Sequence, residues 1–72
     1  MIERFGEKLR MLREQRGLSL RKIAPMLGYA SHNHIASIER GERKPSAELA
    51  VKVADLFDVP VEVLLRDERE LA

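Results

Sequence analysis

The stretch Ser31-His32-Asn33-His34-Ile35-Ala36-Ser37-Ile38-Glu39-Arg40-Gly41 predicts a short helix with a stop signal at each end. Ser31 can accept a hydrogen bond from a free N–H group of the first turn, and Gly41 can adopt the left-handed conformation that ends a helix. Ile35 and Ile38 are three residues apart and therefore face the interior together. Four short polar residues are left on the outside, namely His32, Asn33, His34 and Ser37.

Short polar side chains at the front of a helix suit the edges of DNA bases, which present hydrogen-bond donors and acceptors in the major groove. A helix that met only solvent would more often carry Glu and Lys there. We therefore expect these four side chains to contact bases. Asn33 is the foremost candidate, because its amide can pair with adenine through two hydrogen bonds. An ordinary surface helix is the alternative interpretation of this segment taken alone.

A second short helix is expected directly before this one, from Leu20 to about Leu27. Ser19 can cap its start and Gly28 can end it, while Ile23, Ala24 and Leu27 would face inward. About three residues, Gly28 to Ala30, would then join the two helices. Such a pair is a helix-turn-helix, in which the second helix lies in the major groove and the first braces against the DNA backbone.

With these features the sequence resembles the phage-repressor and Cro-like helix-turn-helix family, also called the xenobiotic-response-element family. The resemblance implies an all-α, compact five-helix, lambda-repressor-like domain that binds double-stranded DNA and regulates transcription as a repressor. Glu39 matches the family's acidic residue ahead of the glycine, which implies a structural role. The resemblance covers nearly the whole chain and rests on Phe5-Gly6-Glu7-Lys8-Leu9-Arg10, Leu12-Arg13, Arg16-Gly17-Leu18-Ser19, Ile23-Ala24, Leu27-Gly28, Ile35, Ile38-Glu39-Arg40-Gly41, Arg43-Lys44-Pro45-Ser46 and Val59 to Leu65.

Three positions depart from the family pattern. Leu20 stands where many relatives place glutamine, so the contact made by that glutamine is lost. Pro25 lies well inside the second helix, where it removes a backbone hydrogen bond and crowds the carbonyl of Arg21, so we expect a kink or a widened turn. Tyr29-Ala30 makes the turn one residue longer than its commonest form, which affects the angle of the recognition helix.

Three further helices complete the predicted domain. The first spans about Ile2 to Gln15, with Phe5, Leu9 and Leu12 along one face. The fourth spans about Ala47 to Phe57, where Ser46 is its cap and Leu49, Val53, Leu56 and Phe57 face inward. Asp58-Val59-Pro60 interrupts the chain before a last helix from Val61 to Leu65, and Arg66 to Ala72 is expected to fray or to extend that helix. No linker or repeat appears, so residues 1–72 are interpreted as one domain.

The net charge of +1 over 72 residues conceals a strong asymmetry along the chain. Residues 1–44 carry ten Lys and Arg against five Asp and Glu, a net +5, whereas residues 45–72 carry three against seven, a net −4. A basic front and an acidic back are expected where one face meets phosphate. The candidate phosphate contacts beside the recognition helix are Arg21, Lys22, Ser31, Arg40, Arg43 and Lys44.

Composition and spacing exclude several other classes of function. The chain has no cysteine, and His32 and His34, two positions apart, would point to different sides of a helix, so we expect no metal site and no cofactor. No nucleophile or phosphate-loop motif is present, so an enzyme is not expected. No apolar run is long enough to span a membrane and the charged start is not a signal peptide, which predicts a cytoplasmic protein.

Two questions about partners stay open at this stage. One recognition helix reads too few base pairs to find a site in a genome, so we expect a homodimer on a two-fold-symmetric operator. Its joining surface would lie in the last helix, at Val61, Val63, Leu64 and Leu65, with the side around Val63 or Leu65 left for the neighbour. The alternative is that Val63 and Leu65 both pack under the tail through Leu71. The rival to a repressor is an antitoxin or co-regulator whose main role is to bind a protein partner. The sequence does not decide whether these residues are a whole protein or one domain of a longer one.

Overall fold

The structure, a computed structural model, describes residues 3–71 and contains five α-helices and no strand within that range. The predicted all-α, five-helix class is thereby confirmed. Glu3 and Arg4 precede the first helix, so its start is later than predicted, and Ile2 lies outside the described residues. The helices are α1 (Phe5–Gln15), α2 (Leu20–Met26), α3 (His32–Glu39), α4 (Ala47–Phe57) and α5 (Val61–Leu65).

Local capping signals explain most of the helix boundaries. Each of the three predicted serine caps accepts a backbone N–H: Ser19 from Lys22 at 3.1 Å, Ser31 from Asn33 at 3.2 Å, and Ser46 from Leu49 at 3.0 Å. The glycines that follow α1, α2 and α3 have φ of 65°, 85° and 79°, the left-handed region that a residue with a Cβ rarely adopts. The serines thus mark the starts of α2, α3 and α4, and the glycines mark the ends of α1, α2 and α3.

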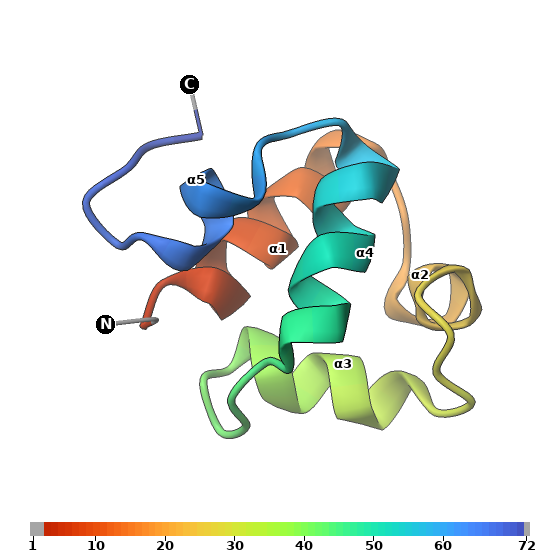
Figure 1. Cartoon of the computed structure of the whole chain (residues 1–72). Helices are drawn as coiled ribbons and strands as arrows, with labels where there is room; N and C mark the ends of the chain where they lie inside the picture. The colour runs from red at the N-terminus through yellow and green to blue at the C-terminus, as the bar shows by residue number, and fades with distance from the viewer. Residues whose placement is uncertain (1–2, 72) are drawn as a thin grey trace.

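The apolar faces of all five helices meet in one core. In Figure 1, α3 runs along the bottom of the molecule, α4 rises above it, and α2 stands at the right, seen nearly end-on. α3 packs against α1 and α2, while α5 packs against α4 and α1. The fully or nearly fully buried side chains of this core are Phe5, Leu9, Leu12, Ile23, Ala24, Leu27, Ile35, Ile38, Leu49, Ala50, Val53, Ala54, Phe57 and Leu64.

The sequence predicts a kink or a widened turn at Pro25; the α2 helix continues through this residue, so of these two the widened turn is wrong. Pro25 is the last residue but one of the helix, so the hydrogen bond that it cannot donate falls in the final turn. Leu27 N–H donates to Ile23 O at 3.0 Å, which restores the helical pattern directly after the proline. Tyr29 N–H then donates to Ala24 O at 2.9 Å and closes the end of the helix.

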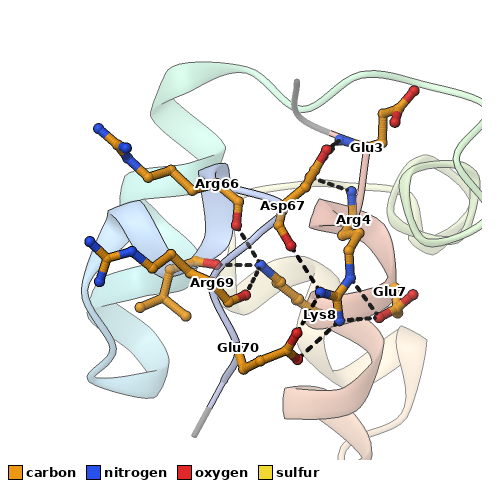
Figure 2. A network of polar contacts seen from close by, with 9 residues as sticks. Glu3, Arg4, Glu7, Lys8, Arg66, Asp67, Arg69 and Glu70 are labelled. Carbon is orange, nitrogen blue, oxygen red and sulfur yellow. Dashed lines mark hydrogen bonds and ion pairs between the residues drawn. The ribbon is translucent and has the colours of Figure 1, made fainter.

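The segment after α5 neither frays nor extends the helix, contrary to the prediction. Residues 66–71 fold back over the start of α1 and are held there by Lys8, whose side chain is completely buried. The ammonium of Lys8 donates to three backbone carbonyl oxygens, of Val63 at 2.7 Å, Arg66 at 2.8 Å and Arg69 at 2.6 Å (Figure 2). These oxygens satisfy all three N–H groups of the buried ammonium, which is the condition for burying such a group.

A second set of contacts joins the same segment to the residues before α1. The Asp67 carboxylate accepts N–H groups from Glu3 at 2.9 and 3.0 Å and from Arg4 at 2.9 Å (Figure 2). The Arg4 guanidinium donates to Asp67 O, to Glu7 and to Glu70. Asp67 thus places a negative charge at the positive end of the α1 dipole, where it stabilises the helix.

Candidate nucleic-acid interface

The α3 helix is closed at both ends as the sequence predicts. Ser31 caps its start, and after its last turn Gly41 N–H donates to Ile38 O at 3.0 Å while Glu42 N–H donates to Ser37 O at 2.9 Å. This pair of hydrogen bonds around a left-handed glycine satisfies carbonyl groups that a helix end otherwise leaves free. The outer side chains of α3 are therefore presented on a short, fully capped helix.

The inner and outer faces of α3 are divided largely as predicted. Ile35 and Ile38 are 0% and 2% exposed and anchor the helix in the core. Asn33 is exposed, while His32 and Ser37 are half-buried at the surface. The Ser37 hydroxyl donates to Asn33 O at 3.0 Å, so its proton is already engaged while its oxygen can still accept a hydrogen bond. These three predicted base contacts are thus at the outer surface of the helix.

His34 differs from the other three predicted base contacts. Its ring is half-buried and stacks on the Tyr29 ring, with 4.5 Å between the ring centroids and 15° between the ring planes. His34 is thus at the surface of the helix, as His32 and Ser37 are, but one face of its imidazole is covered by Tyr29. The sequence signal for this contact is a lone aromatic residue in the turn, Tyr29, which sequence reasoning treated only as extra length.

Basic side chains flank the C-terminal half of α3. A hollow of about 230 Å³ lies between the two helices, and its lining includes Leu20 at the start of α2 and Ala36 and Arg40 at the end of α3. The first turn of α2 is therefore beside the end of α3. Arg21 and Lys22 belong to that first turn, and Arg43 and Lys44 follow in the loop after α3. All four are exposed, and within residues 3–71 none of them forms an ion pair.

Arg40 and Ser31, the other two predicted phosphate contacts, already make contacts within the chain. The Arg40 guanidinium donates to both carboxylate oxygens of Glu42, at 2.9 and 3.0 Å, and this pairing lowers the pKa of the Glu42 carboxyl. A phosphate group would have to share or displace that carboxylate. The Ser31 oxygen accepts Asn33 N–H, while its hydroxyl proton is still available to a phosphate.

A largely buried ion pair fixes α3 to α1 and confirms the structural interpretation of Glu39. The Arg13 guanidinium donates to both Glu39 oxygens, at 2.8 and 3.1 Å, and to Leu18 O at 2.8 Å. Only 12% of the Arg13 side chain and 6% of the Glu39 side chain are exposed. Glu39 is therefore occupied inside the fold.

The predicted dimer surface in α5 is only partly available. Leu64 is 0% exposed, so its assignment to a joining surface is wrong: its side chain completes the monomer's own core. Leu65 packs against the core beside it, and so does Leu71 of the tail. Val61 is 37% exposed, and Val63 and Leu65 are both half-buried, so three of the four predicted residues keep some surface in the monomer.

Within residues 3–71, no group of three or more His, Cys, Asp or Glu side chains is arranged to hold a metal ion. No helix in the same range combines the length and the apolar character needed to cross a bilayer.

Comparison with known proteins identifies the family of the chain. The family model described as helix-turn-helix matches residues 9–64. An HTH-type transcriptional regulatory protein of Pyrococcus furiosus is 39% identical over 56 residues, covering 78% of this chain and 18% of that protein. In Bacillus subtilis, the HTH-type transcriptional regulator AnsR is 38% identical over 64 residues, covering 89% of this chain and 54% of AnsR. The HTH-type transcriptional repressor RghR of the same organism is 37% identical over 65 residues, covering 89% and 47%.

The chain thus spans about half of each Bacillus relative and less than a fifth of the archaeal one. The matched residues include the turn between α2 and α3, the Arg13–Glu39 ion pair, and the loop that carries Arg43 and Lys44. Fold, site geometry and comparisons agree that the chain belongs to the helix-turn-helix family of the phage-repressor and Cro type.

Proposed function

We propose that this chain binds double-stranded DNA in a sequence-specific manner and regulates transcription, with α3 in the major groove. The observation that carries the proposal is the exposed Asn33 in the first turn of a capped α3, together with four exposed basic side chains beside the C-terminal half of the same helix. Base edges specify the sequence, whereas phosphate contacts supply affinity and position. Membership of a family whose relatives include named transcriptional regulators supports the same function.

Within this function, His32, Asn33 and Ser37 contact bases, and Arg21, Lys22, Arg43 and Lys44 contact phosphates. Arg40 joins them at the DNA backbone if a phosphate displaces Glu42, and Ser31 joins them if its hydroxyl donates a hydrogen bond to a phosphate oxygen. A homodimer on a two-fold-symmetric operator fits the small number of base pairs that one α3 helix can contact. A role as a repressor fits the name of the relative RghR, a transcriptional repressor. We assign the protein no catalytic role, and a cytoplasmic location follows from the proposed function.

The test is a selection of bound sequences from random double-stranded DNA, followed by footprinting of the best site. We expect a defined motif that Asn33→Ala flattens at one position per half-site, because an amide pairing with adenine discriminates by about 1–3 kcal/mol. Circular dichroism should stay unchanged, since the Asn33 side chain is exposed. A pool without enrichment, together with tight binding to a toxin or co-regulator encoded nearby, would instead identify a protein-sequestering role.

Phosphate contacts have a different signature from base contacts. Lys44→Gln or Arg43→Gln should weaken specific and non-specific binding together and reduce the salt slope by about one. Arg69→Gln is the matched control, because its exposed side chain points away from the network in Figure 2 and only its backbone oxygen is used there. A Lys44 variant that lost specific binding alone would contradict the phosphate assignment.

A further inference from the structure

The connection between α2 and α3 is long, yet specific contacts hold the front of α3, its first turn, in place. Five residues, Leu27 to Ser31, separate the two helices. A longer turn allows more orientations of the following helix, so the orientation seen needs specific contacts to fix it. Tyr29 supplies two of them, a backbone hydrogen bond to Ala24 O at 2.9 Å and a side chain packed against the core.

The third contact joins this anchored residue to the recognition helix itself. The His34 ring, in the first turn of α3, lies nearly parallel to the Tyr29 ring at 4.5 Å between centroids. His34 follows Asn33 directly in the chain, and no ring nitrogen of His34 forms a hydrogen bond within residues 3–71. Its contribution in this structure is therefore the flat face of the ring, which ties the start of α3 to the turn.

We infer that Tyr29 and His34 form a positioning pair that sets the angle of the front of α3, and so decides which base Asn33 meets. This inference rests on the proposed function. It assigns His34 a role different from base contact: a base contact depends on the imidazole nitrogens, whereas a positioning contact depends on a flat ring of about the same size. Tyr29, which is outside both helices, thereby becomes a determinant of sequence preference.

Two substitutions of His34 separate the two roles. His34→Phe keeps the flat ring and removes both nitrogens, while His34→Asn keeps polar hydrogen-bonding groups and removes the ring. We expect His34→Phe to retain the selected motif and its affinity. His34→Asn and Tyr29→Ala should broaden the motif and weaken specific binding up to about tenfold, with non-specific binding unchanged. Tyr29→Phe, which keeps the stack, should behave as the wild type.

A double-mutant cycle tests whether the two rings act together. If they do, Tyr29→Ala combined with His34→Asn should weaken specific binding no more than either change alone. Urea unfolding of each variant shows whether the fold is intact at the assay temperature, since Tyr29 also packs against the core. A His34→Phe variant that loses preference at one base position while Tyr29→Ala keeps the full motif would overturn the inference.

A DNA-free measurement separates failure of this inference from failure of the proposed function. In proton NMR, the stacked Tyr29 ring should shift the His34 ring protons upfield, and this shift should vanish in Tyr29→Ala and survive in Tyr29→Phe. His32, which has no such stack, provides the reference within the same molecule. An unshifted His34 in the wild type would refute the pair. If the His34 ring protons are shifted but the protein selects no DNA motif, the stack exists, and both the role of the pair in DNA binding and the proposed function are refuted.

Discussion

Arg13 and Glu39 form the strongest polar link between α1 and the recognition helix, with two hydrogen bonds of 2.8 and 3.1 Å between largely buried side chains. The pairing raises the pKa of the Arg13 guanidinium, chiefly through its hydrogen bonds to Glu39. A third hydrogen bond, to Leu18 O, ties the same guanidinium to the turn before α2. One side chain on α1 thus holds both the end of α3 and the approach to α2.

Removing the charge of Glu39 should destabilise the fold strongly. Glu39→Gln leaves the buried Arg13 guanidinium with Leu18 O and one amide oxygen, so we expect a loss of about 3 kcal/mol in the free energy of unfolding. Urea denaturation at neutral pH measures it. Glu14→Gln is the matched control, because Glu14 pairs with Arg10 at 3.2 Å in an exposed position and should change stability by less than about 0.5 kcal/mol. Equal effects of the two changes would contradict the structural role of Glu39.

Gly6 should not tolerate even one added methyl group. A Cβ at Gly6 would lie 2.1 Å from Ile38 O and 2.9 Å from Glu39 Cα, so α1 would have to move away from the backbone of α3. In an ordinary helix, alanine in place of glycine stabilises by about 1 kcal/mol. Here we expect Gly6→Ala to destabilise by about 1–3 kcal/mol and to weaken DNA binding. Met11→Ala, on the exposed side of the same helix, is the control, and a more stable Gly6→Ala protein would refute the close approach.

The C-terminal segment should be released by acid. The N–H groups of Arg4 and Glu3 lower the pKa of the Asp67 carboxyl below its ordinary value, and the Arg4 side chain lowers that of Glu70. A carboxyl whose pKa is lower in the folded state stabilises the fold above its ordinary pKa. This stabilisation is lost as the pH falls through the lowered value, below about pH 4.

Asp67→Asn isolates this effect. The variant should be less stable than the wild type at pH 7, and the difference should shrink as the pH falls through the lowered pKa of the Asp67 carboxyl, where the wild type also loses this charge. Thermal unfolding across this pH range measures the difference, and the amide signals of Glu3 and Arg4 should move over the same range. Asp55→Asn, an exposed change on α4, controls for the loss of one negative charge. A difference of constant size at every pH would show that Asp67 acts without its charge.

The parts of the structure that the sequence predicts well depend on neighbouring residues. The bounds of α4 and α5 agree with the prediction, since Ser46 and Asp58-Val59-Pro60 act within a few residues of the helices that they limit. The division of α3 into two faces likewise follows from a spacing of three residues between Ile35 and Ile38. Such signals are local and can be read from one sequence.

The parts that were missed depend on contacts between distant residues. Lys8 is bonded to carbonyl groups 55 to 61 positions away, and Asp67 to N–H groups 63 and 64 positions away. One clue was present: Lys8 is three residues after Phe5 and four before Leu12, on the apolar face of α1. A lysine on a buried face needs oxygen partners, yet nothing in the sequence says which segment supplies them. The Tyr29–His34 stack was missed for a related reason, because a turn residue has no periodic pattern.

The α5 residues that remain at the surface of the monomer narrow down where two copies of the chain would meet. One α3 helix contacts only a few base pairs, so two copies with half-site centres roughly 34 Å apart would supply the missing specificity. Of the four residues assigned to the joining surface, Val61 is exposed, Val63 and Leu65 are half-buried, and Leu65 also packs against the core. We therefore expect Val61 and Val63 to lie at the centre of the contact between the two copies.

Val63→Glu should dissociate the dimer and weaken operator binding much more than non-specific binding, since only the symmetric complex gains from pairing. Val51→Glu is the matched control, because Val51 is 51% exposed on α4 and outside the proposed contact. Leu65→Glu is a poorer test, as it would place a charge against the core and destabilise the monomer itself. Sedimentation equilibrium with and without operator DNA measures the oligomeric state. A wild-type monomer that binds DNA one-to-one with an asymmetric footprint would rule out the dimer.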